Sequence, residues 1–228
     1  MKYEISEAVA RKVVETVDQG LVHGLGTQRP GSMCVEAAVC FAMGLPHGDN
    51  PPCVGSAVRS YKIRLNDSVW SSNEARAKGM RRVAVAQLGS DEIDQKEFAK
   101  EVIVGGIRDI LPIALRAAAK AVPAHAEALE LAAIACEAIK EFIQAKPVAE
   151  KARSVARAAA AAAAAYAYAD AYADAAADAA AAADAYADAA RKKARDGVLS
   201  IAAEVAVKAL IKLGSKGCDW LFLCDEPS

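Results

Sequence analysis

The chain of 228 residues is poor in aromatic side chains, which make up 5% of it, and its formal net charge is only −1. A balance this close to neutral gives no global field that would attract extended nucleic acid or an anionic membrane. The six cysteines include no CxxC pair, so we expect reduced thiols rather than a zinc ribbon or a redox motif. The first 20 residues lack the apolar run of a secretory signal. We therefore expect a cytoplasmic protein that binds neither extended nucleic acid nor a membrane.

Convincing strand patterns are also lacking. The hydrophobic content of 54% is inflated by alanine, the strongest helix former. The sequence predicts an all-α fold, a multi-helix bundle with a long Ala-rich helix near the C-terminus. We divide it into residues 1–122, a helical region with Gly/Pro-rich loops and basic helices, and residues 123–228, an Ala-rich long-helix bundle. The two parts are expected to pack as one unit.

Capping residues and breakers place the helix boundaries. Ser6 and Gly20 are expected to bound the first helix, and Ser32 to cap a second over MCVEAAVCFAM. Ser71 with Glu74 three residues later matches the capping box that opens a helix. Further helices are expected over residues 54–67, 125–144 and 198–213. Another should start at Asp94 and bend near Gly105, Gly106 and Pro112. The long Ala-rich helix should have Pro147 as its first residue.

Residues 159–190 contain only alanine, tyrosine and aspartate. Five aspartates exclude a membrane span, at about 2.5–3.5 kcal/mol each in mid-bilayer. On a helix these aspartates share an arc of roughly 120°, with three tyrosines opposite. A straight helix over residues 147–195 would extend roughly 70 Å, so the segment either forms a hairpin or, as we expect, packs against a second copy in a homo-oligomer. The side chains concerned are Asp170, Asp174, Asp178, Asp184 and Asp188, and Tyr168, Tyr172 and Tyr186.

Cations are concentrated between residues 54 and 82, where seven Lys or Arg stand against two acidic residues. Arginines with an aromatic ring suit a phosphate-bearing, nucleotide-like ligand, and Gly/Pro-rich loops expose backbone N–H groups to anions. Trp70 is placed to stack on a base. Alternatively, the cations form a solvated face or pair with the aspartates of the Ala-rich helix. The candidate ligand-binding residues are His23, Arg29, His47, Arg59, Arg64, Trp70, Arg81 and Arg82.

Cys34 is the candidate for a different chemistry. It lies at the start of a predicted helix, where the helix dipole should lower the pKa of its thiol. With His47 and Asp49 it defines the alternative of a cysteine-dependent enzyme. The glycine, cysteine and AMGLP elements of GSMCVEAAVCFAMGLPHGD resemble the cysteine helix of transglutaminase-like proteins, although no later strand-borne histidine and aspartate are visible here.

Cys34-Val-Glu36 and Pro52-Cys53 also resemble the zinc deaminase pattern. Ser56 stands where the second of the paired cysteines would be, and a catalytic zinc needs three protein ligands. No metal site and no cofactor are expected.

The runs GSMCVEAAVCFAMGLPHGD, CVGSAVRSYKIRLND and WSSNEARAKGMRRVAVAQLGS, with the Ala/Tyr/Asp segment, resemble uncharacterised alanine-rich proteins of bacteria and their phages over residues 20–115. The resemblance implies the cytoplasm of a bacterium, or host cytoplasm for a phage-encoded chain. Our leading hypothesis is a non-enzymatic helical oligomer that binds a small anionic, nucleotide-like ligand, as a phage protein sequestering a host-defence nucleotide signal would. The alternatives are the Cys34 enzyme and a protein-binding inhibitor that uses the Ala-rich helix.

Overall fold

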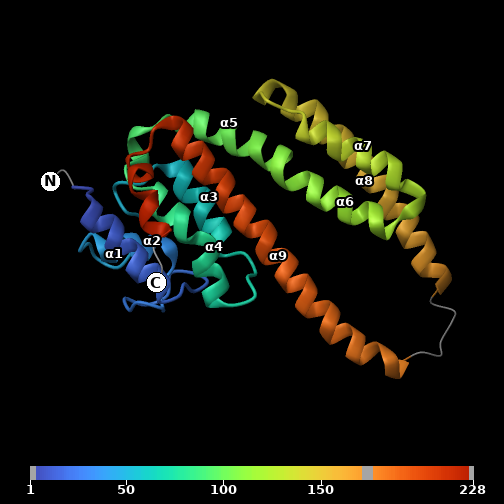
Figure 1. The fold of residues 1–228 in the computed structure, drawn as a ribbon, viewed down its shortest axis with the longest axis horizontal. Coiled ribbons are helices and arrows are strands. Elements are labelled where there is room, and N and C mark those ends of the chain that lie inside the picture. Colours follow the sequence, from blue (N-terminus) through green and yellow to red (C-terminus); the bar gives the residue numbers. More distant parts are fainter. Residues whose placement is uncertain (1–3, 171–176, 226–228) are drawn as a thin grey trace. The chain divides into compact units, whose positions relative to one another are not determined.

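The computed structural model describes the backbone of residues 4–170 and 177–225, and their side chains except those of residues 162–170 and 177–191. The all-α prediction is confirmed, because no strand occurs within these ranges and the only pairing found there is an isolated bridge between Gly26 and Met33. The α-helices are α1 Glu7–Asp18, α2 Val35–Ala42, α3 Ser56–Asn66, α4 Asn73–Ala86, α5 Gln95–Gly105, α6 Leu111–Ala121, α7 Ala126–Glu137, α8 Phe142–Asp170 and α9 Ala177–Leu213 (Figure 1). Shorter segments are the 3₁₀ turns η1 Ser90–Glu92, η3 Pro123–His125 and η4 Lys216–Cys224, and the π-helical turn η2 Gly106–Ile110.

The chain forms two compact units. Unit 1 comprises Met1–Val102 and Lys192–Ser228, and unit 2 comprises Ile103–Arg191. The sequence-based boundary at residues 122 and 123 falls inside unit 2, between α6 and α7, which pack on each other. The C-terminal residues return to unit 1, because apolar side chains near the end of α9 belong to the core of that unit.

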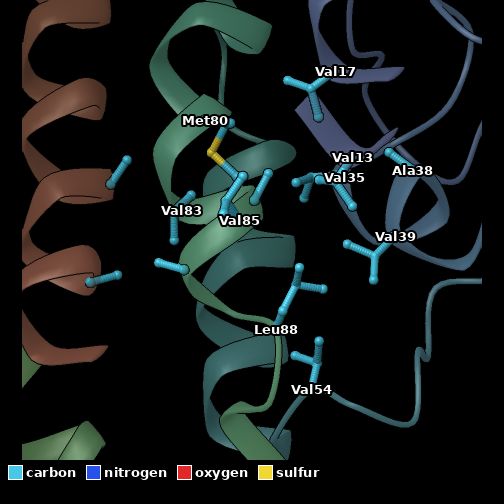
Figure 2. Close-up of a cluster of buried hydrophobic side chains, with 14 of the residues drawn as sticks. Val13, Val17, Val35, Ala38, Val39, Val54, Met80, Val83, Val85 and Leu88 are labelled. Carbon is cyan, nitrogen blue, oxygen red and sulfur yellow. The ribbon is translucent and has the colours of Figure 1, made fainter. Parts of the chain in front are cut away.

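The core of unit 1 lies between α1, α2, α4 and the last part of α9. Val13 and Val17 of α1, spaced one turn apart, are fully buried against Val35 and Val39 of α2 and Met80 of α4 (Figure 2). The segment CDWLFLC forms η4, which packs on α1 and α4. This core fixes α4 between α1 and η4, which positions the candidate site described below.

The predicted start of the first helix is confirmed, but two other predicted caps are wrong. Ser6 accepts a hydrogen bond from the Val9 N–H. The cap of α2 is Cys34 rather than Ser32, because the Cys34 sulfur accepts a hydrogen bond from the Ala37 N–H. The cap of α4 is Ser72, whose hydroxyl oxygen accepts from Ala75 at 3.1 Å.

Ser71, the predicted cap, has another role. Its N–H and its hydroxyl both donate to the carboxylate of Asp196 on α9, the first at 2.9 Å. A cap prediction uses only local sequence and could not anticipate a partner 125 residues away.

The predicted bend after α5 is present as the π-helical turn η2. The Leu111 N–H donates a hydrogen bond to the Gly106 carbonyl, five residues back, as in a π-helix. Pro112 lies at the start of α6, a position at which the N–H group that proline lacks is least needed. Glycine and proline thus located a break whose π geometry the sequence did not specify.

Unit 2 has its own core of α6, α7 and α8, with Leu115, Leu129 and Cys136 buried at its centre. The helix predicted over residues 125–144 is divided, because α7 ends at Glu137 and α8 begins at Phe142. The Gln144 side chain accepts hydrogen bonds from the N–H groups of Lys140 and Glu141 at this junction. Pro147, expected to open the long helix, therefore lies inside α8.

The long C-terminal helix is confirmed as α9. The choice between a continuous Ala-rich helix and a hairpin depends on residues 171–176, which lie outside the described residues. The aspartate and tyrosine faces, and the expected self-association through them, concern side chains that are also outside the description.

Candidate functional site

A groove of about 520 Å³ lies on unit 1 where α4 meets α1 and the end of η4. Lys78, Arg81 and Arg82 of α4 line it, and their spacing of three and four residues places them on neighbouring turns of one helix face. This volume is in the range of small-molecule sites. The remaining lining residues are Asp18, Glu74, Ala77 and Cys224.

Arg81, one of the residues that line this groove, is held by three hydrogen bonds. Its Nε and Nη2 donate to the two carboxylate oxygens of Asp18 at 2.7 and 3.0 Å, and its Nη1 donates to the Cys224 carbonyl. The hydrogen bonds to Asp18 raise the pKa of Arg81 above its ordinary value. Arg81 therefore joins α4 to α1 and η4, and its planar fork is oriented before any ligand arrives.

The other two cations of the groove are less constrained. Arg82 Nε lies 2.9 Å from Glu204 of α9 and its Nη1 lies 3.7 Å from Asp225, and the side chain is 36% exposed. Lys78 is exposed, and its ammonium has no partner among the side chains that the structure describes. The groove thus combines three cations: the Arg81 guanidinium, which is fixed by hydrogen bonds, the Arg82 guanidinium, whose ion pairs a ligand would have to replace, and the Lys78 ammonium, which has no partner among the described side chains.

The other predicted ligand residues do not join this group. Arg59 is tied to Asp49, with Nε donating to the backbone carbonyl at 2.5 Å and Nη2 to the carboxylate at 2.8 Å. Arg64 on α3, and His23 and Arg29 in the glycine-rich loop, are exposed and do not line the groove. His47 Nε2 lies 3.2 Å from the Gly26 carbonyl.

Trp70 cannot serve as the stacking platform that the sequence suggested. Its side chain is 6% exposed, and its indole N–H donates to the Leu65 carbonyl at 3.0 Å. The ring packs against Gly79 of α4 so closely that a methyl group at that position would overlap it. Trp70 is a core residue because its N–H finds a backbone acceptor inside the protein.

A second, smaller hollow of about 40 Å³ lies between the glycine-rich loop, α2 and α3. Cys34 and Asp49, two members of the predicted catalytic set, line this cavity together with Glu36, Asn66 and Asp67. His47 does not line it. The structure therefore brings two of the three predicted catalytic residues to one place.

Cys34 does not have the properties of an activated nucleophile. The residue is 5% exposed, and burial raises the pKa of its thiol more strongly than the hydrogen bonds from the Ala37 and Glu36 N–H groups lower it. The expectation that the helix terminus lowers this pKa is wrong, because desolvation disfavours the thiolate more than the amides stabilise it.

Beside Cys34 lies a fully buried ion pair that the sequence reading missed. Glu36 Oε1 is 2.8 Å from Lys62 Nζ, and both side chains are 0% exposed. The contact is close but not aligned as a hydrogen bond, so both Glu36 oxygens and the Lys62 ammonium lack a hydrogen-bond partner among the described residues. Burial raises the pKa of Glu36 and lowers that of Lys62, and the attraction between them opposes both shifts.

One local signal could have found this pair. Glu36 interrupts the apolar run VEAAVCFA, where a carboxylate would face the core and need a counter-charge. Lys62 was counted with the surface cations because charge counting along the sequence does not distinguish a buried from an exposed lysine.

Comparisons with known proteins do not place the chain in a family. No protein-family model matches it, and searches of curated proteins and of solved structures give no significant match. Over the described part of the chain, no helix is long and apolar enough to cross a membrane. No three His, Cys, Asp or Glu side chains within that part are placed to hold a metal ion.

Proposed function

We propose that the protein binds a small anionic, nucleotide-like ligand in the groove formed by α1, α4 and η4, without turning it over. The observation that carries this proposal is the convergence of Lys78, Arg81 and Arg82 on one hollow large enough for a mononucleotide. Asp18 and Cys224 use three of the five N–H donors of Arg81, so Arg81 offers a phosphate its two remaining N–H groups in a fixed position, and Lys78 supplies a mobile point charge.

The charges of the groove define how such a ligand would bind. Asp18 is already neutralised by Arg81, so it does not oppose an anion as a free carboxylate would. Arg82 would exchange its exposed contact with Glu204 for a phosphate oxygen, at little cost because exposed ion pairs contribute only about 0–1 kcal/mol. The base would not stack on Trp70, so recognition is concentrated on the phosphate end.

The biological setting that we propose rests on the sequence resemblance alone: a phage protein that removes a nucleotide signal of host defence. Sequestration requires binding without chemistry, and the buried Cys34 with its raised pKa fits a protein that does not use this thiol as a nucleophile.

Lys78 provides the sharpest test, because it lines the groove and its ammonium makes no ion pair or hydrogen bond with the described residues. Isothermal titration against mononucleotides, cyclic nucleotides and inorganic phosphate should identify a ligand for the wild-type chain. Lys78→Glu should then weaken binding roughly 10- to 150-fold, since a charge-assisted contact contributes about 1.5–3 kcal/mol. Thermal stability should be unchanged.

Lys96→Glu is the matched control, because Lys96 is an exposed lysine of unit 1 outside the groove. It makes the same change in net charge and should bind as the wild type does. Equal weakening by both variants would show a general charge effect, and unchanged binding by Lys78→Glu would exclude the groove as the site.

A further inference from the structure

The outer face of α7 in unit 2 carries large apolar side chains that the described part of the chain leaves uncovered. Leu131 is 61% exposed and Ile134 is 51% exposed. Leu129 and Cys136, on the opposite side of the same helix, are buried in the core that α7 shares with α6 and α8. A surface helix normally presents polar residues on the side away from its core. α7 therefore has a second apolar face, and exposed apolar faces of this kind mark interaction surfaces.

The residues around Leu131 and Ile134 allow another helix to approach closely. Leu131 belongs to a series whose members are three or four residues apart, the spacing of a helix–helix seam, and the others are Ala128, Ala135 and Ala138. The alanines at both ends of this series are exposed and the middle one is half-buried. With small neighbours, the two large side chains project from the face, which suits an α-helix as the partner.

Charged residues of opposite sign lie at the two ends of this face. Glu127 is exposed in the first turn of α7, and Lys140 is exposed just after the helix ends. Within the described ranges, neither the carboxylate of Glu127 nor the ammonium of Lys140 has an ion pair or a hydrogen bond. The two residues are about 20 Å apart along the helix, too far to pair within one chain. Each end is thus available to an opposite charge on a partner.

The two ends also complement each other in shape. At the end that carries Glu127, a hollow of about 420 Å³ lies between α6 and α7, with the small side chains of Ala119 and Ala126 in its wall. At the other end, Phe142 and Ile143 begin α8 and are 45% and 81% exposed. Projecting apolar side chains at one end and a hollow at the other are what a self-complementary surface requires.

We propose that α7 is the interface of a homodimer, in which a second copy of the chain packs antiparallel on the same face. A two-fold axis through the middle of α7 would place Leu131 of one copy beside Ile134 of the other, and the reverse. In that register Glu127 lies opposite residue 138, and a lysine side chain spans the remaining two residues, about 3 Å, to Lys140. Ion pairs at both ends favour the antiparallel orientation, because a parallel pair would place Glu127 beside its own equivalent. The proposal is independent of the groove on unit 1.

Ile134→Gln tests the interface, with Ile211→Gln on α9 as the matched control. Ile211 is also an isoleucine on a helix and is also 51% exposed, but it lies in unit 1. Sedimentation velocity from roughly 1 μM to 1 mM should show the wild type and the control passing from monomer to dimer. Ile134→Gln should raise the dissociation constant at least about tenfold, since each dimer loses two buried isoleucine side chains. A wild-type chain that stays monomeric, or equal effects of the two variants, would overturn the proposal.

Exchange of the end charges tests the antiparallel orientation. Glu127→Lys and Lys140→Glu should each weaken self-association roughly two- to tenfold, because either homodimer then has like charges at both ends. An equimolar mixture of the two variants should recover the affinity of the wild type, because both ends of the mixed dimer again carry opposite charges. High salt should reduce these differences. Circular dichroism checks that both variants fold, and a mixture that dimerises no better than either variant alone would refute the arrangement.

Discussion

Replacing Glu36 with glutamine should destabilise unit 1 severely. The substitution keeps the shape of the side chain but leaves the Lys62 ammonium, 0% exposed, without a counter-charge in the core. Removing one partner of a buried ion pair costs about 3–5 kcal/mol, a large share of the ~5–15 kcal/mol by which a typical domain is stable. Urea unfolding followed by tryptophan fluorescence measures it, because both tryptophans, Trp70 and Trp220, lie in unit 1.

The double variant Glu36→Leu with Lys62→Met separates charge from packing. It removes both charges and fills similar volume with apolar groups, a change that is often neutral or stabilising by about 1–4 kcal/mol. We therefore expect the double variant to be at least as stable as the wild type. Glu7→Gln, in an ion pair whose side chains are 45% and 54% exposed, is the surface control and should change little.

Two results would refute this reasoning. A loss from Glu36→Gln as small as that from Glu7→Gln would show that Lys62 is not desolvated. A double variant as unstable as the single one would show that packing, rather than charge, dominates at these positions.

Two further predictions concern the core of unit 1. The Cys34 thiol, with its raised pKa, should react slowly with iodoacetamide at neutral pH in the native protein and fast only after unfolding, as mass spectrometry of the digest would show; fast native labelling would contradict the assignment. Gly79→Ala should lower the free energy of unfolding by about 1–3 kcal/mol because the new methyl group would overlap Trp70. Gly197→Ala on α9, with open space around it, should raise the free energy of unfolding by roughly 0.5–1 kcal/mol. Melting temperatures that move in the same direction for both glycine variants would exclude the overlap as the cause.

The sequence predicted the helices well where their ends depend on local chemistry. Ser6 capping α1 and the break at Gly106 involve contacts within a few residues, so composition and spacing suffice. Two of the failures involve longer-range partners. Ser71 matches a capping box, yet it bonds to Asp196, and the return of residues 192–228 to unit 1 depends on core contacts that no local pattern contains.

The candidate site was only partly predictable for the same reason. The charge count between residues 54 and 82 included α4, whose Arg81 and Arg82 line the groove. The same count could not show that Arg76 is buried and donates to the carbonyls of Asn66 and Leu21. A run of cations therefore indicates a basic region, while the tertiary partners decide which of its members face a ligand.

The partners of the groove cations also determine what kind of binding it can support. Arg81 is fixed and neutralised by Asp18, so an anion gains only the remaining N–H donors of Arg81 and not a bare charge. Arg82 must be released from Glu204, and only Lys78 contributes an uncommitted charge within the described part of the chain. Binding energy is then a difference between ligand contacts and the ion pairs that they replace, and exposed contacts of this type are screened by salt. An anion in this groove should consequently be held by several separate contacts, from Lys78, Arg82 and the remaining N–H donors of Arg81, so a singly charged anion should bind much more weakly than a phosphate, whose several oxygens can accept all of them.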